Sequence, residues 1–295
     1  MRDSLFYMVI GLILTSFFAH PAAAEQRTLT TNTGYQLDYD VRGQESNGPI
    51  ALIIMHGKNF PAEATLHRFT AWSERVAREG FRVYTPVMPW SARWDGTHED
   101  ATSALDALVE LAAKDGKKII VGGHSMGAMF TILYRASALP ASVVGKFVSA
   151  PGHMLDMIPA SSSFWNDINP SLSRAKSLEA FGKGKEKIQF GGRNTAGSQK
   201  ITESYEMTPQ IYLSWHDPQH LPKHTGALQM ASVPVLWTVG GNDPLVQNNA
   251  SESTFKIMPS NPKSSFFLLG GKDHSTSFQA STEKLIPWMK SLTTQ

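Results

Sequence analysis

The sequence predicts an α/β fold in which a mainly parallel sheet is covered by helices on both faces. Short runs of β-branched and aromatic residues alternate with longer segments that have helical spacing, which is typical of parallel sheets. The runs at 50–55 and 119–121 are continuously apolar, as in strands that are buried on both faces. Neither a repeat nor a linker divides the chain, so residues 25–295 are expected to form a single domain.

The expected elements follow the chain in order. Residues 25–43 alternate as two short strands that meet at a turn at 32–34. Further strands are expected at 50–55, 81–87, 118–123, 147–150, 233–239 and 265–269. Helices are expected at 62–80, 97–113, 128–138, near 247–257, and in a closing segment that ends near 292.

Residues 152–230 interrupt this alternation. They are rich in Ser, Gly, Lys, Pro and aromatic residues, with a helix expected near 171–180 and loose glycine–lysine segments at 182–197. The basic side chains of the latter, Lys183, Lys185, Lys187 and Arg193, are expected to face solvent. A long insertion without strand periodicity is usually functional, so residues 152–230 are interpreted as a cap or lid.

Residues 1–24 have the features of a secretory signal peptide. Arg2 provides a charged start, residues 5–18 are apolar, and Ala22 to Ala24 form a small-residue cleavage site. The apolar run is shorter than the roughly 20 residues that a membrane span needs. We therefore expect cleavage after Ala24, a periplasmic or extracellular location, and no stable membrane insertion of the mature chain. A retained amino-terminal anchor is the alternative.

Composition excludes several classes of function. The chain has no cysteine, which rules out thiol nucleophiles, thiolate metal sites and disulfides. A net charge of +2 gives no electrostatic basis for binding nucleic acid. Phosphate-binding and dinucleotide fingerprints are missing, so no cofactor is expected. His216, His220 and His224 have helical spacing, but Pro218 and Pro222 interrupt the helix that would align them, so no metal site is expected.

Ser125 is the strongest candidate for a catalytic residue. It stands in the sequence Gly-His-Ser-Met-Gly at 123–127, between an expected strand and an expected helix. A serine exposed at such a sharp corner needs glycine on both sides, because the backbone there leaves no room for larger residues. The amino terminus of the following helix directs N–H groups to the place where negative charge would develop.

Asp243 and His274 are candidates for the partners of Ser125. A serine hydroxyl is a weak nucleophile and needs a base, and that base needs a group to orient it. Asp243 and His274 each follow the carboxyl end of an expected late strand, which makes Asp243 the orienting acid and His274 the general base. A turn or helix-cap role is the alternative for Asp243. Asp273 is interpreted as a solvated loop charge.

The backbone N–H groups of Lys58 and Met126 are candidates for an oxyanion hole. Lys58 lies in the loop after the strand at 50–55, and Met126 follows the nucleophile directly. His56 and Gly57 are expected beside the substrate, since glycine lets the backbone approach a ligand closely. Asn59 remains an alternative to Lys58 as the second donor.

Several aromatic side chains could line an apolar pocket between the sheet and the cap. The main candidates for substrate binding are Trp90, Trp165 and Trp215, and Phe164 belongs to the same group. Ordinary packing in the core and cap is the alternative interpretation.

Residues 50–61, 118–139, 233–244 and 265–275 together resemble the α/β-hydrolase superfamily, in which the catalytic residues follow the order Ser, Asp, His. The resemblance implies an eight-stranded, mainly parallel sheet, a serine-hydrolase triad and an acyl-enzyme intermediate. It covers nearly all of the mature chain, but the cap matches no particular subfamily.

These observations favour a secreted esterase or lipase-like serine hydrolase that acts on a small ester or acyl substrate. An amidase, peptidase, thioesterase or acyltransferase could use the same triad, because one acyl-enzyme serves all of these reactions. A noncatalytic binding protein with the same fold is the alternative from another class.

Overall fold

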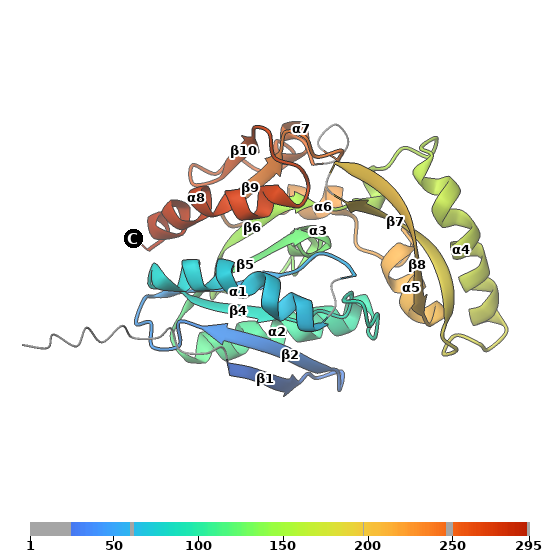
Figure 1. The fold of residues 1–295 in the computed structure, drawn as a ribbon, viewed down its shortest axis with the longest axis horizontal. Coiled ribbons are helices and arrows are strands. Elements are labelled where there is room, and N and C mark those ends of the chain that lie inside the picture. The colour runs from blue at the N-terminus through green and yellow to red at the C-terminus, as the bar shows by residue number, and fades with distance from the viewer. Residues whose placement is uncertain (1–24, 60–61, 197, 246–249, 294–295) are drawn as a thin grey trace, which may run out of the picture.

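The computed structural model describes residues 25–59, 62–196, 198–245 and 250–293. The expected signal peptide and its cleavage site lie outside the described residues. The described chain forms one eight-stranded sheet and a separate two-stranded ribbon, which stands beside one end of the sheet (Figure 1).

The large sheet is mainly parallel, which confirms the predicted fold class. Its strand order is β1-β2-β4-β3-β5-β6-β9-β10. Among the strands of this sheet, β2 runs opposite to the others and pairs antiparallel with β1 on one side and β4 on the other. The carboxyl ends of the parallel strands therefore meet at one edge. The strands are β1 (Glu25–Thr30), β2 (Gln36–Arg42), β3 (Ile50–Met55), β4 (Arg82–Pro86), β5 (Lys118–Ser125), β6 (Val143–Pro151), β9 (Val235–Gly240) and β10 (Ser265–Leu269).

Helices cover both faces of this sheet. In β3, Leu52 packs in the core beneath α1 and α8, whereas its neighbour Ile53 packs beneath α2 and α3. A strand that is apolar at every position, as β3 is, suits a sheet buried on both sides. The helices of the main body are α1 (Ala62–Arg78), α2 (His98–Lys114), α3 (Met126–Leu133), α7 (Glu252–Phe255) and α8 (Thr276–Ser291).

The insertion at 152–230 contains more regular structure than the sequence indicates. The expectation of loose segments at 182–197 is wrong, because β7 and β8 form an antiparallel ribbon there. Figure 1 shows this ribbon at the side of the molecule, with α4 along its outer edge. The cap elements are the short 3-10 helix η1 (Leu155–Met157), α4 (Phe164–Ala180), β7 (Ile188–Ala196), β8 (Gln199–Met207), α5 (Pro209–His216) and α6 (His224–Gln229).

Two glycines conceal the strand pattern of β7. Gly191 and Gly192 interrupt its periodicity, and glycine is usually unfavourable inside a strand. Gly192 is required by the partner strand, because a Cβ at this position would collide with the ring of Tyr205 from β8. Gly192 thus allows the ring of Tyr205 to pack closely against β7.

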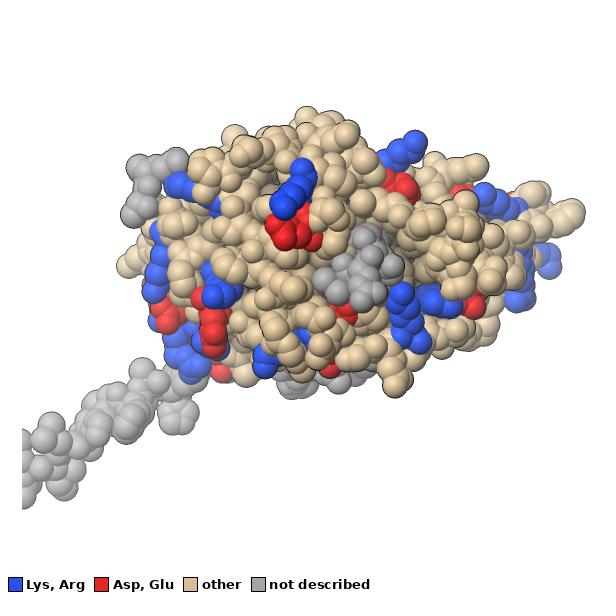
Figure 2. All heavy atoms as spheres, turned by 90° about the horizontal axis from the view of Figure 1, so that it is seen from above, with Lys and Arg blue, Asp and Glu red and all other residues tan. Residues whose placement is uncertain are grey.

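Charged side chains of both signs are dispersed over the face seen in Figure 2, and they form no large patch of a single sign. This distribution agrees with the small net charge of the chain. Within the described residues, every helix is too short or too polar to cross a membrane.

Candidate active site

Ser125 lies at the corner between β5 and α3, in a backbone conformation that is unusual for serine. Its φ is 56° and its ψ is −115°, a region that side chains rarely adopt. The flanking glycines make this corner possible. A Cβ on Gly123 would collide with the backbone of Gly127, and a Cβ on Gly127 would lie 2.5 Å from the carbonyl oxygen of Met55.

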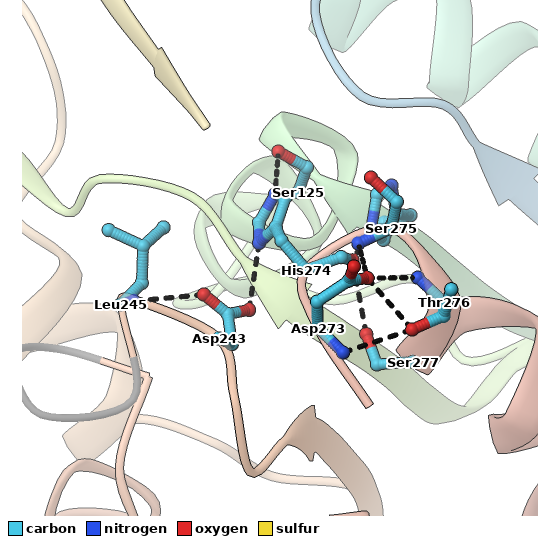
Figure 3. Close-up of polar contacts among 9 residues, drawn as sticks. Ser125, Asp243, Leu245, Asp273, His274, Ser275, Thr276 and Ser277 are labelled. Carbon is cyan, nitrogen blue, oxygen red and sulfur yellow. Dashed lines mark hydrogen bonds and ion pairs between the residues drawn. The ribbon is translucent and has the colours of Figure 1, made fainter. Parts of the chain in front are cut away.

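The structure brings Ser125, His274 and Asp243 into one hydrogen-bonded series (Figure 3). The Oγ of Ser125 lies 2.9 Å from Nε2 of His274, and Nδ1 of His274 lies 2.8 Å from Oδ2 of Asp243. A carboxylate can only accept, so Nδ1 carries the proton and Nε2 is free to accept from the serine hydroxyl. All three side chains are buried, and Ser125 is the most accessible of them at 9% exposure.

Neighbouring groups hold the acid and the base in place. The second carboxylate oxygen of Asp243 accepts a hydrogen bond of 2.8 Å from the backbone N–H of Leu245. The carbonyl oxygen of His274 accepts a hydrogen bond of 2.8 Å from Nε2 of His124. Burial, together with the nearby His274, lowers the pKa of His124 to about 3, so its ring is neutral and can donate. Sequence reasoning overlooked His124, although its position directly before the nucleophile was a signal.

Asp273 is positioned differently from its neighbour His274. Its Oδ1 accepts hydrogen bonds from the backbone N–H groups of Ser275 and Thr276 and from the Thr276 hydroxyl, at 2.8–3.0 Å. These bonds, first among them that from the Thr276 backbone, lower the pKa of Asp273. Asp273 therefore stabilises the first turn of α8. Asp243 is the carboxylate that pairs with His274.

The loop after β3 presents Lys58 toward the same corner. The backbone N–H of Asn59 donates to the carbonyl oxygen of Trp90 at 3.1 Å, so it is already used within the protein. This contact favours Lys58 over Asn59 as a donor to substrate. Met126, the first residue of α3, has an N–H that cannot bond within the helix. The N–H groups of Lys58 and Met126 therefore stay the predicted donors to an oxyanion.

A family comparison agrees with this architecture. Residues 88–280 match the family model described as serine aminopeptidase, S33, a family of α/β-hydrolases. This match spans more than half of the chain. The chain belongs to this α/β-hydrolase family. The search of curated proteins found no significant match.

Many solved structures share the fold of this hydrolase at low sequence identity. Est1E from Butyrivibrio proteoclasticus is 15% identical with a TM-score of 0.62, covering 92% of this chain and 99% of its own. A soluble variant of monoglyceride lipase from Saccharomyces cerevisiae is 13% identical with a TM-score of 0.64, covering 92% and 96%. The α/β-hydrolase GrgF from Penicillium sp. sh18 is 17% identical with a TM-score of 0.67, covering 92% and 97%. At these identities the likeness shows the fold alone.

A cavity of about 50 Å³ lies beside Ser125, between the sheet and the cap. Three of the residues that were expected to contact the substrate or its oxyanion line this cavity, namely Lys58, Met126 and Trp215. Its lining consists of Lys58, Ser125, Met126, Met129, Gly152, His153, Leu155, Phe164, Ile168, Arg193, Asn194, Trp215, His216 and Leu245.

The structure places the other expected pocket residues, His56, Gly57, Trp90 and Trp165, outside this lining. His56 is fully buried, accepts a hydrogen bond of 2.9 Å at Nε2 from the Met88 backbone, and stays neutral because burial lowers its pKa to about 4. Its carbonyl oxygen, which precedes Gly57 in the chain, accepts from Nε1 of Trp90 at 2.9 Å. His56 and Trp90 therefore support the loop that carries Lys58, without lining the cavity themselves.

Trp90 and Trp165 each pack behind a residue that does line the cavity. The ring of Trp90 is fully buried and meets the ring of Trp215 edge to face, with centroids 5.3 Å apart. The ring of Trp165 stands perpendicular to that of Phe164, and its Nε1 donates to the Pro159 carbonyl at 3.1 Å. The pocket surface is therefore formed by their neighbours Trp215 and Phe164.

Arg193 was expected to face solvent as part of a basic stretch, and this expectation is wrong. It lies on β7 and lines the cavity, and its Nε–H donates to Asp167 of α4. Lys183, Lys185 and Lys187 are exposed as expected. Arg193 was missed because β7 itself was missed, and the alternating polarity of β8 was the signal that could have revealed the ribbon.

The three histidines of the cap are held by separate partners. Nδ1 of His216 contacts the carbonyl of its own helix, whereas His220 pairs with Asp217 and His224 with Asp156. In the part of the chain that the structure describes, no group of three or more His, Asp or Glu side chains is placed to hold a metal ion.

Proposed function

We propose that this hydrolase is an exported serine enzyme that cleaves carboxylic esters of small molecules through a covalent acyl-enzyme. The observation that carries the proposal is the series of hydrogen bonds from Ser125 through His274 to Asp243, at 2.9 and 2.8 Å, opening on a cavity. This arrangement can activate a serine hydroxyl and stabilise the imidazolium that results.

In the first half of the reaction, Oγ of Ser125 attacks the ester carbonyl carbon while Nε2 of His274 takes the hydroxyl proton. The carbonyl oxygen becomes an oxyanion, which the N–H groups of Lys58 and Met126 would stabilise. Each such donor typically lowers the barrier by about 3 kcal/mol. Asp243 stays ionised and stabilises the imidazolium of His274. The tetrahedral intermediate then collapses, the C–O bond breaks, and His274 returns the proton to the departing alcohol.

In the second half, a water molecule replaces the alcohol. His274 takes a proton from this water, the resulting hydroxide adds to the acyl carbon, and a second oxyanion forms in the same place. Collapse breaks the bond to Oγ of Ser125, and His274 returns the proton to that oxygen. The net reaction consumes one ester and one water and yields one acid and one alcohol.

The charges around the cavity favour esters over aminopeptidase substrates. An aminopeptidase must accept a positively charged α-amino group, for which a carboxylate is the natural partner. The described lining contains two cations, Lys58 and Arg193, and no carboxylate, since Asp167 and Glu203 lie outside it and already have partners within the protein. A positively charged α-amino group would therefore find no free carboxylate in the lining, whereas an ester needs none.

The proposal can be tested with a panel of synthetic substrates for the mature protein. We expect hydrolysis of p-nitrophenyl butyrate, little or no release of p-nitroaniline from aminoacyl p-nitroanilides, and loss of ester turnover in Ser125→Ala. Equal rates for esters and aminoacyl anilides would overturn the preference for esters. Ester turnover that persists in Ser125→Ala would overturn the catalytic assignment.

Export is proposed on the amino-terminal pattern alone. We expect the protein in the periplasm or the medium, with a mature chain that begins at Glu25. Amino-terminal sequencing of protein recovered from cell fractions checks this, and a full-length chain in the membrane fraction would contradict it.

A further inference from the structure

The charged side chains that line the cavity are all positive. Lys58 enters from the loop after β3 and Arg193 from cap strand β7, so both walls contribute a cation. No Asp or Glu is found among the described residues of the lining. The carboxylates nearest to these cations, Asp167 beside Arg193 and Glu203 near Lys58, lie outside the lining.

Tyr205 of β8 brings the two cations to the same part of the site. Nζ of Lys58 lies 5.2 Å from the centre of the Tyr205 ring, and the hydroxyl of Tyr205 donates to the carbonyl oxygen of Arg193 at 3.3 Å. The Tyr205 side chain is almost fully buried, so it holds the loop and the cap strand together.

Both cations keep hydrogen-bonding capacity for a ligand. Arg193 uses Nε–H to pair with Asp167, which leaves the four N–H groups on the two terminal nitrogens of the guanidinium. The ammonium of Lys58 makes no hydrogen bond to any residue that the structure describes, although Glu203 lies near enough to favour its charged form. The carboxylate of Glu203 is itself engaged by the side-chain amides of Asn59 and Asn194.

The histidines of the cavity add no charge. Burial, followed by the neighbouring Lys58, lowers the pKa of His153 well below its usual range and that of His216 to about 3. Both rings are therefore neutral near pH 7.

We propose that Lys58 and Arg193 form a subsite that binds a carboxylate on the substrate, so that the enzyme prefers anionic esters. This inference rests on the proposed esterase function and names the substrate class for it. A guanidinium and an ammonium recognise a carboxylate through charge-assisted hydrogen bonds, which are about twice as strong as neutral ones. The apolar wall, which includes Leu155, Phe164 and Ile168, suits the carbon chain that joins the carboxylate to the ester.

The test compares pairs of esters in which one member carries a carboxylate and the other is neutral. Monoethyl glutarate and ethyl valerate place the charge on the acyl side. (4-Carboxyphenyl) acetate and (4-carbamoylphenyl) acetate place it on the leaving group. The readout is the ratio of kcat/KM for the anionic ester to that for its neutral partner. We expect a ratio of at least about tenfold in one of the two pairs.

Variants assign this preference to the two cations. We expect Arg193→Met and Lys58→Met each to reduce the ratio by about tenfold or more, and Arg193→Lys to retain part of it. The substitution at Lys58 leaves its backbone N–H in place. Lys185→Met removes an exposed cation of the cap and should leave the ratio unchanged. Should Arg193→Met fail to fold, Lys58→Met and Arg193→Lys still decide the matter.

A wild-type ratio near one in both pairs, or ratios that survive both methionine substitutions, would overturn the subsite. Hydrolysis without charge discrimination would leave the proposed esterase function intact. If none of the four esters were cleaved, the proposed function itself would fail.

Discussion

At the scale of single residues, the candidate triad could be predicted because each member lies at or just beyond the carboxyl end of a strand with a clear pattern. Ser125 ends β5, Asp243 and His274 lie in the loops after β9 and β10, and the carboxyl ends of parallel strands meet at one edge. Arg193 could not be predicted in the same way. Glycines interrupt the pattern of its strand, and the residue that requires Gly192, Tyr205, lies on another strand. Contacts between distant segments leave little trace in local composition.

The role of Asp243 can be tested by Asp243→Asn. An amide can donate to Nδ1 of His274, which would favour the wrong tautomer and leave Nε2 unable to accept the serine proton. We expect kcat to fall by about 10³–10⁴-fold, with little change in KM or in thermal stability. Ester kinetics and a thermal melt measure both. A decrease of less than tenfold would show that Asp243 does not orient the base.

The pH dependence of charge preference tests Lys58. Burial lowers the pKa of Lys58 to about 8, and the nearby Glu203 opposes this shift. The other groups around the ammonium, His153, His216 and Tyr205, remain neutral between pH 7 and 9, because burial lowers the pKa of the histidines and raises that of the tyrosine. Lysine is charged below its pKa, so its attraction for a carboxylate weakens as pH rises through 8.

We therefore expect the ratio of kcat/KM for monoethyl glutarate to that for ethyl valerate to decrease from pH 7 to pH 9. Effects of pH on the catalytic steps that both esters share cancel in the ratio. In Lys58→Met the ratio should not change over this range. A wild-type ratio that stays constant or rises would contradict the assignment.

At the scale of elements, most strands and helices of the main body were predicted close to their observed bounds, although the strand expected at 147–150 spans Val143–Pro151, whereas the strands of the cap were missed. The strand at 50–55 has the expected bounds, since a strand inside a sheet is selected for continuous apolar character, and the edge strand at 265–269 also has its expected bounds. The ribbon of β7 and β8 packs on one side only and contains glycines, which weakens its pattern. The helix expected at 128–138 ends at Leu133, and the chain then turns through Arg135, whose φ is 45°.

Gly192→Ala tests the packing of the ribbon. The added methyl group would overlap the ring of Tyr205, so the ring or the strand must move, which typically costs about 1–3 kcal/mol. Because Tyr205 contacts Lys58, we expect both a lower melting temperature and a lower kcat/KM. Gly191→Ala is the matched control, since its methyl group would meet no atom closer than 3.3 Å. Equal effects of the two substitutions would argue against this account of the ribbon.

At the scale of the whole molecule, the cap forms one wall of the site and narrows the space beside Ser125. A cavity of about 50 Å³ has room for only a few water-sized groups. We expect kcat/KM for p-nitrophenyl esters to be highest for short acyl chains and to fall by about tenfold or more between butyrate and palmitate. A preference for palmitate would mean that the cap opens widely during turnover.

The central claim is that Ser125 is a nucleophile activated by its neighbours. The most direct measurement is the intact mass of the mature protein after treatment with a fluorophosphonate, followed by mapping of the modified peptide. We expect one adduct on Ser125 in the wild type and none in Ser125→Ala, with both proteins giving the same circular-dichroism spectrum. An unlabelled wild type, or an adduct that persists in Ser125→Ala, would contradict the claim.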